Sequence, residues 1–584
     1  MSVNYRIIMI LLLAMVLVWD FSPILSSSDS YLYAEISAEL AKSGGFAFLT
    51  HLGADWLDKP HFPFWVTAIF FRMFGIGTTS YMLSGFVFYT LGGIYTYRLA
   101  KQLYNQEVAL LSTLVYFSVL RICLVVIDLR AECFLLGEIV PAAFYWLRFY
   151  KDQRIITLNA VFGAIFSACA VMTKGVFVIV PIFSGLAVLA VYYKIIGSKE
   201  IESKDAQRLP NLLIKLFIAI LMIGLLIMPE LLSLYLQFDL HPEKVVFNKQ
   251  NVSGLKWFFW GSQFGRFLNT GEITKGGGNY LFFTHTFLWS FLPWTFICIL
   301  GWHSEIKALI QNFSKYSNGV FIYLGASFLI PFIMFSLSKF QLDFYIVILF
   351  PFAAITTGNY LYQASEIIKG RILVLQVVVT LLMLSLFLLF VGHFNPADGI
   401  RAGLIILAIL FMIVIVQIFK FNLLMLNKII LITLLNITIV FTGLMIVNNT
   451  VYAQYDVGYR LYNTIQDHDI ADTPIAVYGI DPILIDQIII HNPHTDVMHI
   501  SDLLALQDEY QRFLLADRSR TMGHNLAKYT LLVVNNDEAT VSNVKTMFPK
   551  AVLLSQYSFM RWEHFFDVLV RLKHLPKNIN VYYI

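Results

Sequence analysis

The sequence predicts a polytopic α-helical membrane protein that ends in a small α/β domain. Of the 584 residues, 58% are hydrophobic and only 13% are charged, whereas soluble domains carry about 25% charged residues. Apolar runs of near-bilayer length recur up to about residue 450, and beyond that point the composition changes abruptly. The net charge of +4 is small, with no long Lys/Arg cluster. These features exclude a cytosolic enzyme and a nucleic-acid binder.

The apolar runs predict about thirteen membrane-spanning helices of roughly 20 residues each, the length that a bilayer core requires. The first run, Ile7 to Val18, has the length of a signal-peptide core, but Trp19 to Pro23 follows it without a small-residue cleavage site. We therefore expect a retained first helix. The predicted centres lie near residues 15, 89, 116, 141, 163, 186, 221, 293, 327, 352, 381, 410 and 437.

Lysine and arginine fall in alternate short loops, and this pattern sets the predicted orientation. The loops carry Arg98 and Lys101, Lys151 and Arg154, Lys199, Lys204 and Arg208, Lys307 and Lys315, Lys369 and Arg371, and Lys420 and Lys428. Cytoplasmic placement of these loops puts the N-terminus inside and the C-terminus outside. We expect a transmembrane domain over 1–450, with outer loops 26–80 and 232–283, and an outer domain over 451–584.

The C-terminal segment alternates short apolar runs with polar, helix-like stretches. Strands are predicted at Ile475 to Tyr478, Thr530 to Val534 and Ala551 to Leu554, and helices at Ser501 to Asp517 and Glu538 to Met547. This alternation is typical of an α/β domain, and the apolar content is too high for the alternative, a disordered tail. The four cysteines, which all lie in apolar runs before residue 300, exclude a disulfide framework and a zinc ribbon.

The first outer loop begins with a serine-rich stretch that ends at Asp29. A serine or aspartate there can cap a helix, and Leu32, Ile36 and Leu40 follow at helical spacing. We predict an amphipathic helix on the outer membrane surface. Asp29 and Tyr33 then share one face, so Asp29 is either a functional carboxylate or only the helix cap.

Further along the same loop, the segment Asp58-Lys59-Pro60 precedes several aromatic residues. A residue before proline is disfavoured in a helix, so we expect Lys59 on an extended bend. The alternative role for Lys59 is snorkelling to lipid headgroups.

Other ionic groups lie at the predicted outer ends of spans: Asp128, Arg130, Lys174, Arg266 and Lys339. Glu132 and Glu138 enter the fourth span, where an ionisable group is costly without a partner or a function. Each alone could be an ordinary interfacial charge. Together they concentrate positive charge on the outer side, against the usual trend, and an anionic lipid phosphate would explain this.

These motifs resemble the GT-C membrane glycosyltransferases related to protein O-mannosyltransferases, and most closely the bacterial ArnT-type lipid A aminoarabinose transferases. The resemblance extends from residue 1 to about 450. The segments that carry it are, in family order, Asp29-x-x-x-Tyr33-Ala34-Glu35-Ile36, Asp58-Lys59-Pro60, Asp128, Thr173-Lys174-Gly175 and Ser336 to Tyr345. Departures include Ser30 and Leu32 in place of family charges, Asp58 in place of a glutamate, and Gln263 in place of a histidine.

The resemblance implies an undecaprenyl-phosphate-linked sugar as donor, with lipid A or another envelope lipid as acceptor on the periplasmic face of a bacterial inner membrane. Lys59, Lys174, Arg266 and Lys339 would bind the donor phosphate, and Tyr33, Glu35 and Tyr345 the substrate. Asp29 is the candidate catalytic carboxylate, with Asp128 second. The resemblance requires no cofactor and leaves room for a divalent metal at Asp58.

Three alternatives stay open on the sequence. A protein O-glycosyltransferase would use the same chemistry on a different acceptor. A flippase or transporter for lipid-linked sugars is a different class, although the expected internal repeat is not apparent. A structural protein that docks partners through its C-terminal domain is the third.

Overall fold

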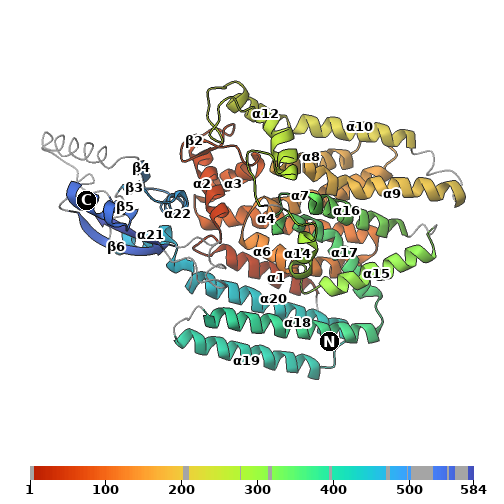
Figure 1. The fold of residues 1–584 in the computed structure, drawn as a ribbon. Helices are drawn as coiled ribbons and strands as arrows, with labels where there is room; N and C mark the ends of the chain where they lie inside the picture. The colour runs from red at the N-terminus through yellow and green to blue at the C-terminus, as the bar shows by residue number, and fades with distance from the viewer. Residues whose placement is uncertain are drawn as a thin grey trace.

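A computed structural model describes residues 5–154, 156–200, 209–276, 278–313, 318–393, 398–450, 452–468, 474–495, 497–500, 531–548, 551–559 and 577–583. A large helical bundle makes up most of the molecule, and a small sheet domain lies beside α2 at one end of it (Figure 1). The predicted fold class, a polytopic helical membrane protein with a C-terminal α/β domain, is confirmed.

Nearly every predicted span centre lies inside a helix. By length and composition, five described helices can cross a membrane alone, or up to eight if each bent pair is one span. The helices of the bundle are α1 (Tyr5–Asp20), α4 (Thr78–Leu103), α5 (Gln106–Ser118), α6 (Leu120–Ile127), α7 (Ala131–Lys151), α8 (Leu158–Lys174), α9 (Ile179–Glu200), α10 (Leu209–Leu226), α15 (Thr295–Gln311), α16 (Asn318–Leu337), α17 (Phe350–Gln363), α18 (Glu366–His393), α19 (Asp398–Lys420) and α20 (Met425–Thr450).

The prediction of one straight span centred near residue 293 is wrong. Here α14 (Phe282–Ser290) meets α15 at an angle of 112°. Pro293 lies at the break, where its ring and missing N–H disfavour a continuous helix. The break is packed into the protein, because Phe291 and Trp294 are fully buried and the indole of Trp294 donates to Ser118 at 2.8 Å. A hydropathy pattern gives no sign of such a turn.

Helix α7 lies at the centre of the bundle, packed against α4 and α8. Its side chains are buried along almost the whole helix. A Cβ added at Gly137 would lie 2.5 Å from the carbonyl oxygen of Phe88, so α4 approaches closer than any larger residue would allow. Side-chain caps start the neighbouring helices, Asn105 for α5 and Thr157 for α8.

The first outer loop folds against the C-terminal domain. It contains α2 (Ser28–Ser43), a two-stranded hairpin of β1 (Thr50–His51) and β2 (Ala54–Asp55), and α3 (Phe62–Phe74). The predicted surface position of α2 is wrong, because residues on all its sides are buried, including Tyr31, Glu35 and Ile36. Helix α3 covers one side, and α22 (Pro482–His491) of the C-terminal domain covers another.

The second outer loop consists mainly of short helical segments. Its elements are α11 (Met228–Leu234), a π-helix at Tyr235–Asp239, α12 (Gly254–Lys256), a π-helix at Trp257–Gly265 and α13 (Arg266–Leu268). Gln237 connects the two outer loops, because its side-chain amide accepts from the backbone N–H of Leu49 at 3.1 Å and donates to the Leu49 carbonyl at 2.8 Å.

The C-terminal elements follow the end of α20. They are α21 (Val457–Asp467), β3 (Ile475–Tyr478), α22, β4 (Val497–Ile500), β5 (Leu531–Asn535), α24 (Glu538–Met547), β6 (Val552–Phe559) and β7 (Lys577–Tyr583). The sheet order is β4-β3-β5-β7-β6, in which the first three strands are parallel and β7 is antiparallel to both its neighbours.

The three predicted strands and the predicted helix at Glu538 to Met547 are confirmed. Side chains of β3 and β5 are almost all buried, as expected for parallel strands covered on both faces. The predicted helix at Ser501 to Asp517, and the loop cations Lys204, Arg208 and Lys315, lie outside the described residues.

Candidate active site

Asp58 holds two of the predicted cations. Its carboxylate accepts from Lys59 on one oxygen and from Arg266 on the other, and Arg266 also donates to the Asp58 backbone carbonyl at 3.1 Å. Lys59 lies on a bend before Pro60, as predicted, and Arg266 comes from the end of the π-helix in the second loop. The carboxylate therefore joins a cation from each outer loop.

Arg130 joins the two candidate carboxylates. Its guanidinium donates to Asp29 at 2.5 Å and to Asp128 at 2.8 Å. Asp128 also accepts from the hydroxyls of Ser27 and Ser30, so its oxygens are well occupied. Asp29 keeps 46% of its side chain exposed, against 24% for Asp128. Asp29 is thus the more accessible of the two carboxylates.

Asp29 is not the cap of α2. The cap is Ser27, whose hydroxyl accepts from the backbone N–H of Ser30 at 3.2 Å. Asp29 lies in the first turn of the helix, where a carboxylate also suits the helix dipole. Its position therefore does not depend on capping.

Lys174 is the last residue of α8 and forms an ion pair with Glu132, which comes from α7. Its ammonium also lies 3.9 Å from the ring centroid of Tyr345, a cation–π distance. Glu138, which lies further along α7 and is buried, accepts from the hydroxyl of Thr173 at 2.9 Å. Both predicted intramembrane glutamates therefore have partners at the end of α8.

Gly175 and Gln263 fix the turn that carries Lys174. Gly175 has φ +87°, a region that favours glycine, and a Cβ there would lie 2.0 Å from Nε2 of Gln263. Gln263 donates to the Lys174 carbonyl at 3.3 Å and accepts from the backbone N–H of Phe177 at 3.3 Å. The residue that departs from the family histidine thus positions Lys174 through the backbone.

A pocket opens beside these cations. Its polar lining includes Lys174, Arg266, Tyr345, Ser262 and Gln263. Its apolar lining is mainly aromatic and comprises Phe177, Val178, Phe267, Met334, Phe335, Phe340 and Ile348. A pocket lined by two cations and several aromatic rings suits an amphipathic anion such as a lipid phosphate.

Burial and charge act against each other on the groups of this site. Burial would raise the pKa of the Asp58 carboxyl, but Lys59 and Arg266 outweigh it and hold that pKa below its usual value. The pKa of Lys59 is lowered by burial and by the nearby Arg266. For Arg266, Asp58 outweighs the effect of burial and raises the pKa. The site therefore keeps the Asp58 carboxylate ionised between two closely spaced cations.

Of the other predicted site residues, Tyr33 borders this cluster, whereas the side chains of Lys339 and Glu35 lie outside it. Tyr33 is buried beside Trp56 and Phe64, with ring centroids 6.4 and 5.3 Å away, and Asp29 is among the charges that act on it. The Lys339 side chain is exposed, and only its backbone N–H makes a described contact, to Phe267 at 2.9 Å. Glu35 lies at the interface with the C-terminal domain, where burial raises its pKa to about 10.

Two contributors to the site were not among the predicted site residues. Arg130 was noted only as an interfacial charge, yet it connects Asp29 to Asp128. Arg121 forms an ion pair with Asp343 at 3.0 Å, beside the ring of Phe344. Arg130 and Asp29, and likewise Arg121 and Asp343, are about a hundred residues or more apart in the sequence, so no local pattern indicates their contact. Only the short spacing between Asp128 and Arg130 could have indicated that these two residues are partners.

The known proteins that resemble this chain share its architecture. A family model described as dolichyl-phosphate-mannose-protein mannosyltransferase matches residues 58–227. Two crystal structures of ArnT from Cupriavidus metallidurans, one bound to undecaprenyl phosphate and one in the apo state, superpose with TM-scores of 0.66 and 0.65. In both comparisons the identity is 15%, and the match covers 99% of this chain and 97% of the ArnT chain. The chain has the GT-C fold of ArnT.

The match to ArnT covers the C-terminal domain as well as the helical bundle, whereas the sequence resemblance ended near residue 450. The family-model match includes Asp58, Lys59, Asp128 and Lys174, and it ends before the second outer loop that supplies Arg266. No curated protein matches the chain in sequence. The resemblance stated from the motifs is thus confirmed as an ArnT-like fold.

Proposed function

We propose that this protein is a membrane glycosyltransferase that takes a sugar from a polyprenyl-phosphate donor. The observation that carries the proposal is the convergence of Lys59, Lys174 and Arg266 beside an aromatic-lined pocket among the membrane-spanning helices. The fold supports it, because the ArnT crystal structure with the same architecture is bound to undecaprenyl phosphate. The acceptor we propose is lipid A or another envelope lipid on the periplasmic face.

The reaction breaks the bond between the anomeric carbon and the phosphate oxygen, and negative charge grows on the leaving phosphate. Lys174 and Arg266 line the pocket and are held by Glu132 and Asp58, so they need no rearrangement to stabilise that charge. Lys59 adds a third cation through the same Asp58 carboxylate. Tyr345, which also lines the pocket, would donate a hydrogen bond to the phosphate or the sugar.

Asp29 is our candidate for the reacting carboxylate. It is the more exposed partner of Arg130 and lies near Lys59 and Tyr33. If the acceptor is a hydroxyl, Asp29 accepts its proton as a general base. If the acceptor is an ionised phosphate, Asp29 stabilises positive charge on the sugar ring instead. Asp128 is committed to Arg130 and two serines, so we assign it a positioning role.

Asp58 was the candidate for a divalent metal. Its two oxygens contact Lys59 and Arg266, and these cations already supply the positive charge that a metal would bring to the leaving phosphate. We therefore assign Asp58 to the positioning of these two cations, and we propose no metal in the transfer step.

A second acceptor class, a protein hydroxyl, has support from the description of the matching family model. Mass spectrometry of lipid A and of protein glycans from a deletion strain separates the two. A lost mass increment on lipid A that returns with the wild-type gene, and not with Lys174→Ala, supports the lipid acceptor. A loss confined to glycoproteins supports the protein acceptor.

Purified protein with a synthetic polyprenyl-phosphate sugar distinguishes transfer from transport. We expect release of polyprenyl phosphate that depends on an added acceptor. If the donor is moved between the leaflets of proteoliposomes and never consumed, the protein is a transporter and the proposal fails.

The proposed orientation places the C-terminal domain in the periplasm. Contact between α2 and α22 supports a common side for the first outer loop and this domain. Alkaline phosphatase fused after residue 468 should therefore be active. An inactive fusion there, with an active cytoplasmic reporter at the same position, would reverse the orientation.

A further inference from the structure

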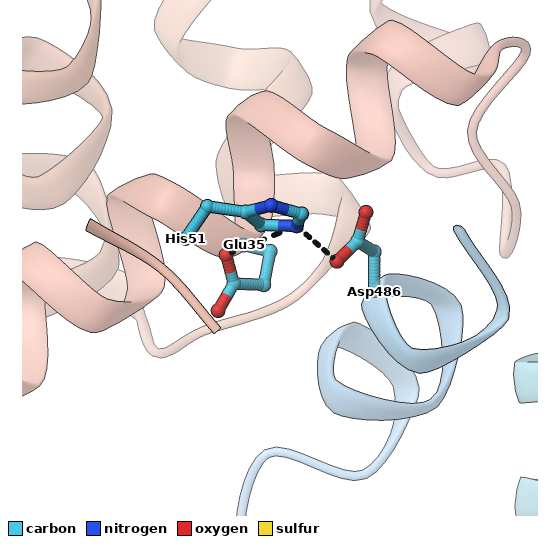
Figure 2. Close-up of side chains that lie close together, drawn as sticks. All are labelled: Glu35, His51 and Asp486. Carbon is cyan, nitrogen blue, oxygen red and sulfur yellow. Dashed lines mark hydrogen bonds and ion pairs between the residues drawn. The ribbon is translucent and has the colours of Figure 1, made fainter. Parts of the chain in front are cut away.

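A second ionisable cluster lies apart from the candidate active site, where the helical bundle meets the C-terminal domain. It consists of Glu35 from α2, His51 from β1 and Asp486 from α22 (Figure 2). Nε2 of His51 lies 2.9 Å from Oδ1 of Asp486 and 3.9 Å from Oε2 of Glu35. One nitrogen or oxygen atom from each residue lies within 4.8 Å of the other two.

The cluster presents two buried carboxyl groups to a single imidazole. The side chains of Glu35 and Asp486 are only 1% and 2% exposed. Oε2 of Glu35 is buried and has no hydrogen-bond partner among the described residues, yet it points toward His51 (Figure 2). A buried carboxylate oxygen without a partner is costly. A cation bound between Glu35, His51 and Asp486 would give this oxygen a partner and would balance both carboxyl groups once they are deprotonated.

We propose that Glu35, His51 and Asp486 bind a divalent transition metal of the Zn²⁺ class. Imidazole nitrogen and carboxylate oxygen are both zinc ligands, and a site with three protein ligands leaves the fourth position for water. Imidazole favours such a metal over Mg²⁺ or Ca²⁺, which take oxygen ligands.

The geometry needs only small movements to accept the ion. Bonds of about 2.0–2.2 Å in a tetrahedral site separate neighbouring ligand atoms by roughly 3.4 Å. The distances from Nε2 of His51 to Asp486 and Glu35, 2.9 and 3.9 Å, lie on either side of that value. The metal replaces the His51–Asp486 hydrogen bond with one bond to each residue and gives Oε2 of Glu35 its partner. His51 is 21% exposed, which provides access from solvent.

Such an ion joins the C-terminal domain to the helix that carries Asp29. Glu35 and Asp29 both belong to α2, whereas Asp486 belongs to α22. A second polar contact joins the same two parts, because Tyr31 of α2 donates to Asp456 and lies 3.1 Å from Nε2 of His491. The metal therefore acts as a structural clamp on α2, away from the transfer step.

The test measures bound metal in the full-length protein in detergent, stripped with EDTA and then dialysed against Zn²⁺. Plasma mass spectrometry should find about one zinc per chain in the wild type. Glu35→Gln, His51→Gln and Asp486→Asn should each weaken binding by about tenfold or more. His241→Gln is the matched control, because His241 pairs with a carboxylate elsewhere in the second outer loop and should keep the zinc.

Two further readouts separate a metal site from a protonated carboxyl group. Co²⁺ loading should give visible absorption bands in the wild type and in His241→Gln, and none in His51→Gln. EDTA should lower the Tm of the wild type but leave that of Glu35→Gln unchanged. The proposal is overturned if all three cluster variants retain zinc as well as the wild type does. It is also overturned if the wild type binds no zinc and EDTA does not change its Tm.

Discussion

Helices α7 and α19 both contain long apolar runs, although α7 carries more charged residues, and they differ completely in their surroundings. Along α7 nearly every side chain is buried, and its outer end carries the ionic contacts of the site through Arg130 and Glu132. Helix α19 lies at the outer edge of the bundle beside α18 and α20 (Figure 1). Among its described side chains from residue 405 onward, only Phe411, Ile415 and Ile418 are buried. The less apolar of the two helices is therefore the one buried in protein, so burial here does not follow hydropathy.

The comparison teaches where charge is tolerated in this fold. Glu132 and Glu138 enter α7 because Lys174 and Thr173 reach them from α8. At the rim, ionic side chains lie near helix ends, as Lys420 does at the end of α19. The centre of the bundle, around α7, therefore contains the ionic side chains of the site and is tightly packed. The rim, represented by α19, is more exposed and is the part expected to face lipid. Four predictions test this contrast, in order of decreasing expected effect.

The largest effect should follow from removing the negative charge of Asp29, which belongs to α2 and pairs with Arg130 at the outer end of α7. Asp29→Asn should lower transfer by about 10²–10⁴-fold if Asp29 is a general base, because that is the usual contribution of such a group. Thermal unfolding should be nearly unchanged, since Ser27 caps α2. The rate of sugar transfer and the Tm are the measurements.

Ser27→Ala is the matched control for Asp29. It should lower the stability by about 0.5–2 kcal/mol through loss of the cap, and its activity should fall far less. A wild-type rate for Asp29→Asn would remove Asp29 from the mechanism and leave Asp128 as the next carboxylate to test.

Removal of the Lys174 ammonium should have the next largest effect on the rate of sugar transfer. Lys174→Met should reduce transfer by about 10²–10³-fold, by analogy with the loss of one oxyanion-hole donor. Because this change also leaves Glu132 unpaired and only 3% exposed, the protein should lose stability as well. Lys420→Met, at the exposed end of α19, should change neither rate nor Tm.

A double variant separates the two consequences of losing Lys174. Lys174→Met with Glu132→Gln removes the unpaired charge, so we expect the Tm to recover while transfer stays low. Recovery of both would mean that Lys174 serves only to neutralise Glu132.

The sequence predicted which segments carry functional side chains better than it predicted which of those segments contact one another. Asp58-Lys59-Pro60 and Thr173-Lys174-Gly175 were singled out from local spacing, and the structure places their cations beside one pocket or its supporting carboxylate. Arg266 was noted for its charge alone. Its pairing with Asp58 depends on how two distant loops fold together, which no local pattern contains.

The same limit applied to the fold. Strands β3, β5 and β6 were predicted from short apolar runs, but β4 and β7 were not, and the sheet order depends on non-local pairing. Helix α2 was predicted to lie on the membrane surface because only one apolar stripe was considered. Its other side is buried by α22, about 450 residues later in the chain, and that contact also brings Asp486 to Glu35.

Packing at the centre of the bundle gives the third prediction. Gly137→Ala should destabilise the protein by about 1–3 kcal/mol, the usual cost of overpacking a core, because the added Cβ would lie 2.5 Å from the Phe88 carbonyl oxygen. The effect should appear as a lower Tm in detergent and a smaller fraction of folded protein. An unchanged Tm would show that α4 and α7 can separate without cost, and the contrast with the rim would fail.

The smallest effect should come from the same substitution at the rim, and it should have the opposite sign. Gly370 lies inside α18, and a Cβ added there would meet no atom within 4 Å. Alanine loses less backbone freedom on folding than glycine, so Gly370→Ala should raise the stability by about 0.5–1 kcal/mol. The Tm of the two alanine variants, measured side by side, tests packing with identical chemistry. If Gly370→Ala lowers the Tm as much as Gly137→Ala does, Gly370 is packed as tightly as Gly137, and the distinction between a close-packed centre and an open edge of the bundle fails.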